Sequence, residues 1–218
     1  GWIGRCMERL DDLSPYAVVH FGLRPPFALA SATHMPLAVT PALMLAGDPA
    51  RSPALQDARA LAQTSPGENR TLERLRTKWH QAQGRLVEIC AAFEARAPRV
   101  PYPPTDLGQD LRNAAALIHS ELGVRVVSLE MSGFDTHRDQ RVRHERLMVE
   151  LDGALSAFRA DLARSEGGRE ALVLVFSEFG RRVAENASGG SDHGQAGPAL
   201  VLGSGVRGGL YGRPPSLT

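Results

Sequence analysis

The sequence predicts an α/β fold in which a parallel sheet is flanked by helices. The first observation is a set of short apolar runs rich in β-branched residues, at 16–21, 124–129 and 171–176, which are typical of strands. The second is that segments with helical apolar spacing precede the last two runs, and that glycine lies between helix and strand. The order helix, glycine, strand and polar loop therefore occurs twice, and parallel strands joined by helices follow from it.

The N-terminal half is expected to alternate helical and extended segments. Apolar residues recur at helical spacing near the N-terminus, a strand closed by Gly22 follows, and a proline-rich irregular stretch comes next. The expected elements are a helix over 2–13, a strand over 16–21, a short strand near 37–39, and helices over 54–63 and from Asn69 or Thr71 to about 96. We interpret 1–218 as a single domain, with the helical part at about 53–97 as an insertion or cap.

The C-terminal half carries the repeated α/β pattern. The expected elements are a helix over 106–122 ended by Gly123, a strand over 124–129, a helix over 138–164, a turn at Gly167 and Gly168, and strands over 171–176 and 198–202. The strand at 171–176 is continuously apolar, which predicts burial on both faces. The glycine-rich turn at 203–209 has no helical signal after it, so a phosphate-binding loop is not expected there.

Composition excludes several classes of function. The chain has 218 residues, enough for an α/β domain with a substantial core. Its net charge of +1 gives no electrostatic case for nucleic acid or a membrane surface. No apolar run approaches the roughly 20 residues of a membrane span. Cys6 and Cys90 are expected to be unpaired thiols. The chain starts at Gly1 without methionine, and both ends are expected to be cuts in a longer protein.

Acidic and imidazole side chains follow two of the expected strands. They are Asp135 and His137 after the strand at 124–129, and Glu178, Asp192 and His193 after the strand at 171–176. In open α/β sheets, ligands bind in the crevice beyond the carboxyl ends of the strands. These five residues are therefore the candidate site.

The residue types at this site favour a divalent metal. Asp135 and His137 are two apart, so in an extended segment both side chains point to the same side and reach one ion. Asp192 and His193 are adjacent in a glycine-rich stretch and could diverge toward two neighbouring ions. Carboxylate and imidazole ligands suit zinc, manganese or iron. Two ions about 3.5–4 Å apart would clamp the attacking and leaving oxygens of a displacement. Glu178 is a further ligand or a general base.

Structural explanations of the same residues remain open. Asp135 could cap a helix that starts directly after it, and Asp192 could form an Asx turn. Glu178 and Arg181 could form a buried ion pair. His20, which ends an expected strand, is a further candidate outside the main group. If the polar residues only make turns and caps, Glu178, Asp192 and the histidine after it should not converge in space.

Several motifs also carry a family resemblance. These are GWIGR at 1–5, GFDTH at 133–137, SEFGRR at 177–182, DHG at 192–194 and GGLYG at 208–212. In this order they resemble the bacterial family catalogued as domain of unknown function 1501. That family resembles the alkaline phosphatase superfamily, which includes sulfatases and metal-dependent phosphoglycerate mutases. The resemblance implies a parallel sheet flanked by helices, with two divalent metals at the strand ends.

The resemblance also assigns roles to residues. In the superfamily an adjacent Asp-His pair binds metal, which corresponds to Asp192 and His193, and a further Asp and His correspond to Asp135 and His137. The superfamily's nucleophile, a serine, threonine or modified cysteine, has no match here and would lie before the first residue. A last histidine ligand would lie after Thr218. Members of the family resemble proteins exported through a twin-arginine signal, which implies a periplasmic location.

The expected function is therefore a metal-dependent hydrolase that acts on small anionic phosphate or sulfate esters. Asp135, His137, Asp192 and His193 would hold zinc, manganese or a similar ion, with two ions expected in the intact protein. Glu178 would be a ligand or base, and Arg181 would position the anion through bidentate hydrogen bonds. The alternative is a non-catalytic protein that retains the fold and binds a metal or another ligand. A third possibility is a purely structural role for the polar motifs.

Overall fold

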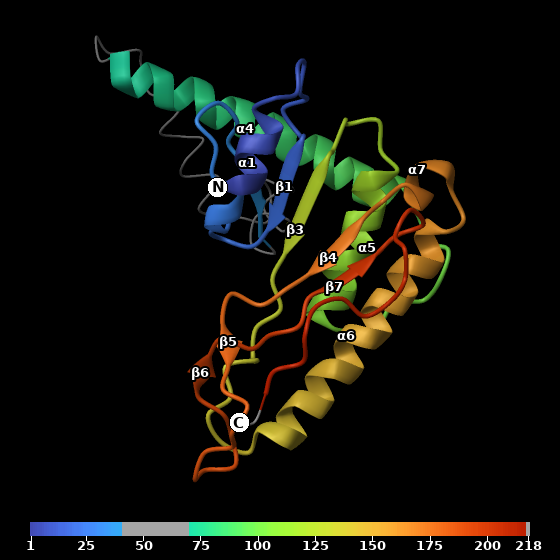
Figure 1. Ribbon diagram of the computed structural model, residues 1–218. Helices are drawn as coiled ribbons and strands as arrows, with labels where there is room; N and C mark the ends of the chain where they lie inside the picture. The colour runs from blue at the N-terminus through green and yellow to red at the C-terminus, as the bar shows by residue number, and fades with distance from the viewer. Residues whose placement is uncertain (41–69, 217–218) are drawn as a thin grey trace. The chain divides into compact units, whose positions relative to one another are not determined.

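The computed structural model describes residues 1–40 and 70–216 of the chain. The chain divides into two compact units (Figure 1). The first comprises 1–97 and 116–130, and the second comprises 98–115 and 131–218. The helix expected over 54–63 lies outside the described residues.

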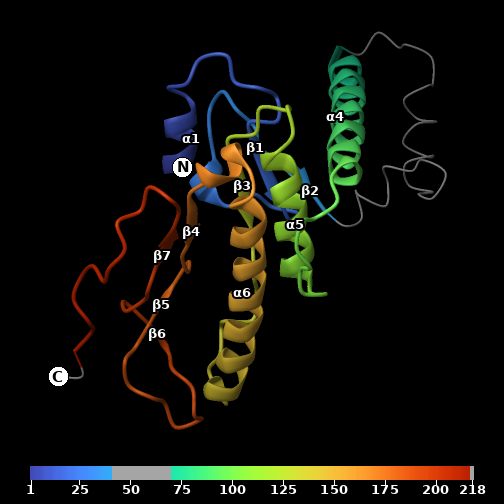
Figure 2. The ribbon, with the colours of Figure 1, turned by 90° about the vertical axis from the view of Figure 1, so that its right-hand side faces the viewer.

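The first unit contains a three-stranded parallel sheet (Figure 2). Its strands are β1 (Val18–Phe21), β2 (Leu37–Val39) and β3 (Val126–Leu129), in the order β2-β1-β3. The sequence predicted all three of these strands. β1 is buried along its whole length because it is the central strand, which explains its continuous apolar character.

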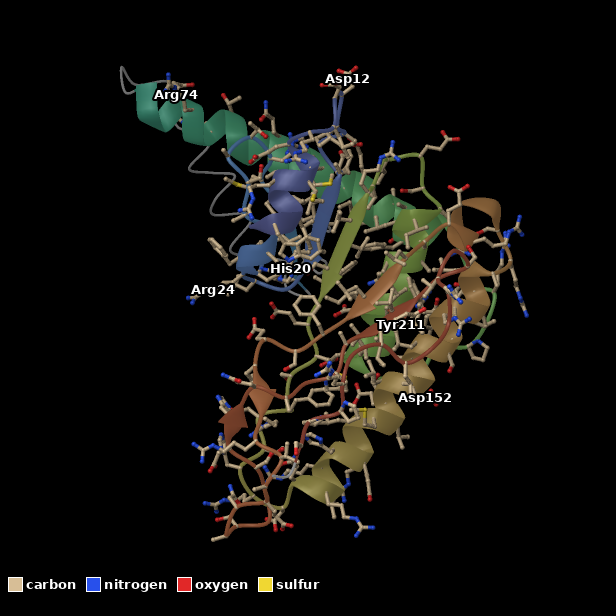
Figure 3. The ribbon with its side chains drawn as sticks, viewed as in Figure 1. Asp12, His20, Arg24, Arg74, Asp152 and Tyr211 are labelled. Atoms are coloured by element: carbon tan, nitrogen blue, oxygen red, sulfur yellow. The ribbon has the colours of Figure 1, made fainter. Side chains whose placement is uncertain are left out.

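The short helix α1 (Trp2–Met7) packs on this sheet. Met7, Val18 and Leu29 belong to one buried cluster, on which Ile3 also packs. The prediction of a helix as far as Leu13 was wrong. The chain leaves the helix after Met7 and reaches Asp12 with a φ of +51°, a left-handed conformation that a regular helix does not contain (Figure 3 labels Asp12 in this turn).

The long helix α4 (Arg70–Ala95) confirms the prediction of a helix that ends near residue 96. Leu86 and Ile89 of its apolar stripe are buried, and the ring of Phe93 lies 6.1 Å from that of Phe21 on β1. The described part of the stripe is therefore a packing face. Both cysteines are free thiols, as the sequence predicted.

Three further helices follow along the chain: α5 (Asp106–Ile118), α6 (Gln140–Leu162) and α7 (Glu166–Arg169). α6 confirms the prediction for 138–164, and its buried residues include Leu155, Phe158 and Leu162. α5 ends before residue 122, but Gly123 does have a positive φ of 73° where the chain enters β3. The pair Gly167 and Gly168 belongs to α7 rather than to a simple turn.

The second unit has two small antiparallel sheets. They are formed by β4 (Val173–Val175) with β7 (Leu200–Leu202), and by β5 (Gly180–Arg181) with β6 (His193–Gly194). Both views place these pairs one after the other along α6 (Figures 1 and 2). In the sequence, these four strands follow β3, the last strand of the one parallel sheet in the described residues.

The prediction that 171–176 forms a parallel strand buried on both faces was wrong. β4 is shorter and runs antiparallel to β7, because the chain turns back through β5 and β6 and returns beside β4 in the opposite direction. Its central residue, Leu174, is 42% exposed. The described residues therefore form a mixed α/β fold with one parallel sheet of three strands.

Within 1–40 and 70–216, no helix combines the length and the apolar character that crossing a bilayer requires.

Candidate metal centre

The loop between β3 and α6 presents Asp135 and His137 on one side. Side chains alternate along this extended stretch: Thr136 is buried, whereas Asp135 and His137 are exposed. The neighbouring Phe134 is anchored by an edge-to-face contact with His144 of α6, with the ring centroids 5.6 Å apart. The sequence prediction that the two polar residues share one side is confirmed.

The β5–β6 pair delivers His193 to the same place. In its register Arg181 lies opposite His193, so both side chains project from the same face. The strands approach closely because Gly180 and Gly194 lie opposite each other. A Cβ on Gly180 would come within 2.7 Å of the carbonyl oxygen of Gly194. These glycines therefore allow the pairing that positions His193.

Three ligand atoms from these two segments converge. Nε2 of His193 lies 2.8 Å from Oδ1 of Asp135, and Nε2 of His137 lies 3.1 Å from the same oxygen. All three ligand atoms lie within 4.8 Å of one another. The side chains of Asp135, His137 and His193 are each about half exposed, at 58%, 49% and 51%. Two imidazole nitrogens and a carboxylate oxygen form a donor set that suits zinc or manganese.

Asp192 lies on the other side of His137. Its Oδ1 atom is 3.3 Å from Nδ1 of His137, and the side-chain amide of Asn186 donates to the same oxygen over 3.1 Å. Asp192 is outside the group whose ligand atoms lie within 4.8 Å of one another. Asp192 therefore adjoins His137, whereas His193 is one of the three converging ligands.

Hydrogen bonds hold both carboxylates in their ionised form. The pKa of Asp135 lies below its ordinary value, mainly because His193 donates a hydrogen bond to it, with smaller contributions from the charges of His137 and Arg181. The pKa of Asp192 is also lowered, first by the hydrogen bond from Asn186 and then by that from His137. Both residues therefore offer a negative charge to a cation.

Arg181 ties the ligand-bearing segments together. Its side chain is only 15% exposed. One terminal nitrogen donates to the carbonyl oxygen of Phe134 over 2.7 Å and lies 3.3 Å from Oδ1 of Asp135, and the other donates to the carbonyl oxygen of Ser191. These bonds link the residue before Asp135 with the residue before Asp192.

Aromatic rings line one side of the cluster. The ring of Phe179 stacks on that of His193 at 4.4 Å, and His193 in turn stacks on His137 at 5.1 Å. The guanidinium of Arg181 lies 4.9 Å from the centre of the Phe179 ring. Phe179 therefore fixes the ring plane of His193 and covers it from one side.

Two of the sequence candidates are not among the three converging ligands. Glu178 is exposed and makes no hydrogen bond or ion pair within the part of the chain that the structure describes. His20 is fully buried on β1 in the first unit, where its Nδ1 atom lies 3.2 Å from the hydroxyl of Ser128 (Figure 3 labels His20). The proposed ion pair of Glu178 with Arg181 does not form, because Arg181 pairs with Asp135 instead.

The simple capping explanations also differ from the structure. The helix after Asp135 starts only at Gln140, and its N-cap residue is Asp139. The Asx turn of this region is formed by Asn186, whose Oδ1 atom accepts from the backbone N–H of Ser188 over 3.0 Å. Asn186 was not among the residues predicted for the site, although an asparagine that opens a glycine-rich loop is a typical signal of such a turn.

The comparisons with known proteins indicate a family. The family model described as "Protein of unknown function (DUF1501)" matches residues 49–218. No curated protein and no solved structure matches the chain. Because the family model covers most of the sequence, including the three segments that build the cluster, the chain belongs to the DUF1501 family.

Proposed function

We propose that the protein is a metal-dependent hydrolase of phosphate or sulfate esters with an alkaline-phosphatase-like fold. The observation that carries the proposal is the convergence of Asp135, His137 and His193 on one point. These residues come from two separate segments, and one carboxylate oxygen faces both imidazole nitrogens. An exported, periplasmic location belongs to the same proposal.

The proposed metal ligands are Asp135, His137, His193 and Asp192. The first three face a common point, and Asp192 is the ligand proposed for a second ion next to His137. A bound divalent ion supplies a Lewis acid for a phosphoryl or sulfuryl oxygen and a charge that stabilises the leaving oxygen. The half-exposed side chains leave the cluster open to a small anionic substrate.

The remaining roles concern substrate and protons. Glu178, exposed on the segment that leads into β5, is the proposed ligand or general base. Arg181 is proposed to position the anion, and its guanidinium lies beside Asp135. The hydrogen bonds from Arg181 to the carbonyls of Phe134 and Ser191 give it a second task, which is to hold the site together.

The test is the metal content and esterase activity of the full-length protein. The protein would be stripped with a chelator, reloaded with Zn²⁺ or Mn²⁺, and assayed for metal per chain and for hydrolysis of a panel of phosphate and sulfate esters. We expect close to two ions per chain and hydrolysis of at least one ester class. Substitution of Asp192→Ala should remove bound metal, and an unchanged metal content would contradict its assignment as a ligand.

The second candidate is a non-catalytic metal-binding protein that retains the fold. The observation that favours it is that Glu178 is exposed and makes no hydrogen bond or ion pair with the cluster in the described residues. The same experiment separates the two candidates. Metal binding without hydrolysis of any ester supports the binding protein, whereas the absence of bound metal excludes both.

A further inference from the structure

Asn186 has its side-chain hydrogen-bonding capacity filled. Its Oδ1 atom accepts from the backbone N–H groups of Ser188 and Gly190, each over 3.0 Å. Its Nδ2 atom donates to the carbonyl oxygen of His137 and to Oδ1 of Asp192, each over 3.1 Å. A carboxamide has two donor hydrogens and an oxygen with two acceptor sites, so all four are used. If the amide were flipped, its NH₂ group would face two N–H donors and its oxygen would face two oxygen acceptors. The hydrogen bonds therefore fix its orientation.

The oxygen of this carboxamide stabilises, through its two hydrogen bonds, the loop of residues 186–191, here called the glycine loop. Beyond the two bonds to Asn186, the loop accepts hydrogen bonds from the start of α6. The N–H of Asp139 donates to the carbonyl of Ser188 over 3.2 Å, and that of Gln140 donates to the carbonyl of Gly189 over 2.9 Å. Asp139 makes no side-chain cap bond, so the glycine loop satisfies N–H groups that the helix leaves open.

The nitrogen side of the same carboxamide faces the metal cluster. It is bonded to the main chain of His137 and to the carboxylate of Asp192, and that carboxylate lies 3.3 Å from Nδ1 of His137. A carboxylate that accepts from one imidazole nitrogen leaves the other nitrogen free to bind an ion. In this structure that other nitrogen, Nε2, faces Asp135.

We propose that Asn186 is a positioning residue of the metal centre, which sets the orientation of His137 and Asp192 toward a divalent cation. The inference rests on the proposed function, because it assumes that the cluster binds metal. Asn186 makes no hydrogen bond to the three converging ligand atoms in the described residues; it acts through the residues it holds. The side-chain amide is needed for this, because the site requires two donors and the loop requires two acceptor sites from one residue.

The variant Asn186→Ser separates the role of the side-chain oxygen in the glycine loop from the role of the side-chain nitrogen at the metal cluster. The serine hydroxyl still accepts from the N–H of Ser188, as in a serine turn, but is too short to donate to Asp192. The matched control is Ser188→Ala. Ser188 is exposed and takes part in the glycine loop through its backbone, so alanine preserves the bonds of the loop. The melting temperature of Ser188→Ala should stay close to that of the wild type. That of Asn186→Ser should be lower, because the bond from the N–H of Gly190 is lost, and a single unfolding transition shows that the variant still folds.

The first readout is the affinity of the full-length protein for Zn²⁺ alone and for Mn²⁺ alone, measured by calorimetric titration. Loss of a residue that orients metal ligands typically reduces metal affinity about 10–100-fold. We expect a reduction of this size for Asn186→Ser and none for Ser188→Ala. Equal affinities of wild type and Asn186→Ser, or an equal loss in both variants, would overturn the inference.

The second readout needs no metal and therefore separates this inference from the proposed function. Ring ¹⁵N shifts of His137 in the metal-free protein report which nitrogen carries the proton. We expect protonated Nδ1, hydrogen-bonded to Asp192, to be populated in the wild type and to lose population in Asn186→Ser, while Ser188→Ala resembles the wild type. An unchanged tautomer ratio in Asn186→Ser refutes the positioning role. A protein that binds no metal but shows the tautomer change contradicts the proposed function and the role toward a cation, and supports only the positioning of His137 by Asn186.

Discussion

Oδ1 of Asp135 lies 2.8 Å from Nε2 of His193, although 58 residues separate the two in the sequence. The same oxygen lies 3.1 Å from Nε2 of His137 and 3.3 Å from the guanidinium of Arg181. One carboxylate oxygen thus stands among three nitrogen groups at an exposed position. A divalent cation that bound there would take its ligands from atoms that already face one another, so little rearrangement is required.

The first prediction concerns the charge of Asp135. The substitution Asp135→Asn keeps the size of the side chain but removes the negative charge at the centre of the cluster. We expect the affinity for Zn²⁺ to fall by more than the roughly 10–100-fold that changes around metal ligands cost. Calorimetric titration of the metal-free protein checks this.

The control for this prediction is Asp139→Asn. Asp139 lies at the end of the same loop, its side chain makes no cap hydrogen bond, and its φ of 48° is one that asparagine tolerates. The control should bind Zn²⁺ as the wild type does. If both variants bind equally well, the cluster is not the metal site.

Local sequence patterns were sufficient to predict the helices and strands whose formation depends on residues close together in the sequence. Helical spacing of apolar residues predicted α4 and α6, and short apolar runs predicted β1 and β3, because the buried residues of each element lie close together in the sequence. The period of two likewise placed Asp135 and His137 on one side. The chemistry of the cluster followed from residue types alone, since carboxylates and imidazoles are metal ligands wherever they converge.

Long-range pairing was not accessible in the same way. A short apolar run such as β4 has the same composition in a parallel or an antiparallel pair. Its partner, β7, follows only after β5 and β6 in the sequence. The close approach of Gly180 to Gly194 depends on a register that no local period specifies. Asn186 was missed for a related reason: its role comes from contacts with His137 and Asp192, not from its neighbours in a pattern.

The second prediction concerns the tight contact between the glycine loop and the loop that carries His137. A Cβ on Gly190 would lie 2.3 Å from the carbonyl carbon of His137, closer than any real contact, and the obstacle is backbone. We expect Gly190→Ala to lower the free energy of unfolding by about 1–3 kcal/mol, as overpacking does. The measurement is urea denaturation. Gly205→Ala is the control, because nothing lies within 4 Å of its Cβ position, and a loss of similar size there would contradict the steric explanation.

The third prediction concerns His20 and pH. Burial lowers the pKa of His20 below its ordinary value of 6.5, although the nearby charge of Glu130 opposes this. When the pH falls below about 6.5, the unfolded chain binds a proton that the folded protein does not, so the stability present at neutral pH is lost as the pH falls toward the folded-state pKa. One such group changes the free energy of unfolding by up to about 1.4 kcal/mol per pH unit.

The variant His20→Gln isolates this contribution. Glutamine does not titrate, so the free energy of unfolding should fall less steeply between pH 6.5 and 5 than in the wild type. Urea denaturation at several pH values measures the slope, and the slope remains informative even where the variant is less stable at every pH. Identical slopes in both proteins would show that His20 is protonated equally in the folded and unfolded states.

The fourth prediction concerns a buried carboxylate in α6. The hydroxyl of Tyr102 donates to Oδ2 of Asp161 over 3.0 Å, and Asp161 is fully buried. Removing one donor from a buried acceptor leaves a desolvation penalty of about 1–3 kcal/mol, so Tyr102→Phe should lower the free energy of unfolding by that amount. The control is Tyr211→Phe, which removes the same atom from an exposed tyrosine whose hydroxyl donates to the carbonyl of Arg207 over 2.9 Å. Water replaces that exposed bond, so the control should change stability by less than about 0.5 kcal/mol. Equal losses in the two variants would mean that the burial of Asp161 does not determine the cost of losing the hydrogen bond.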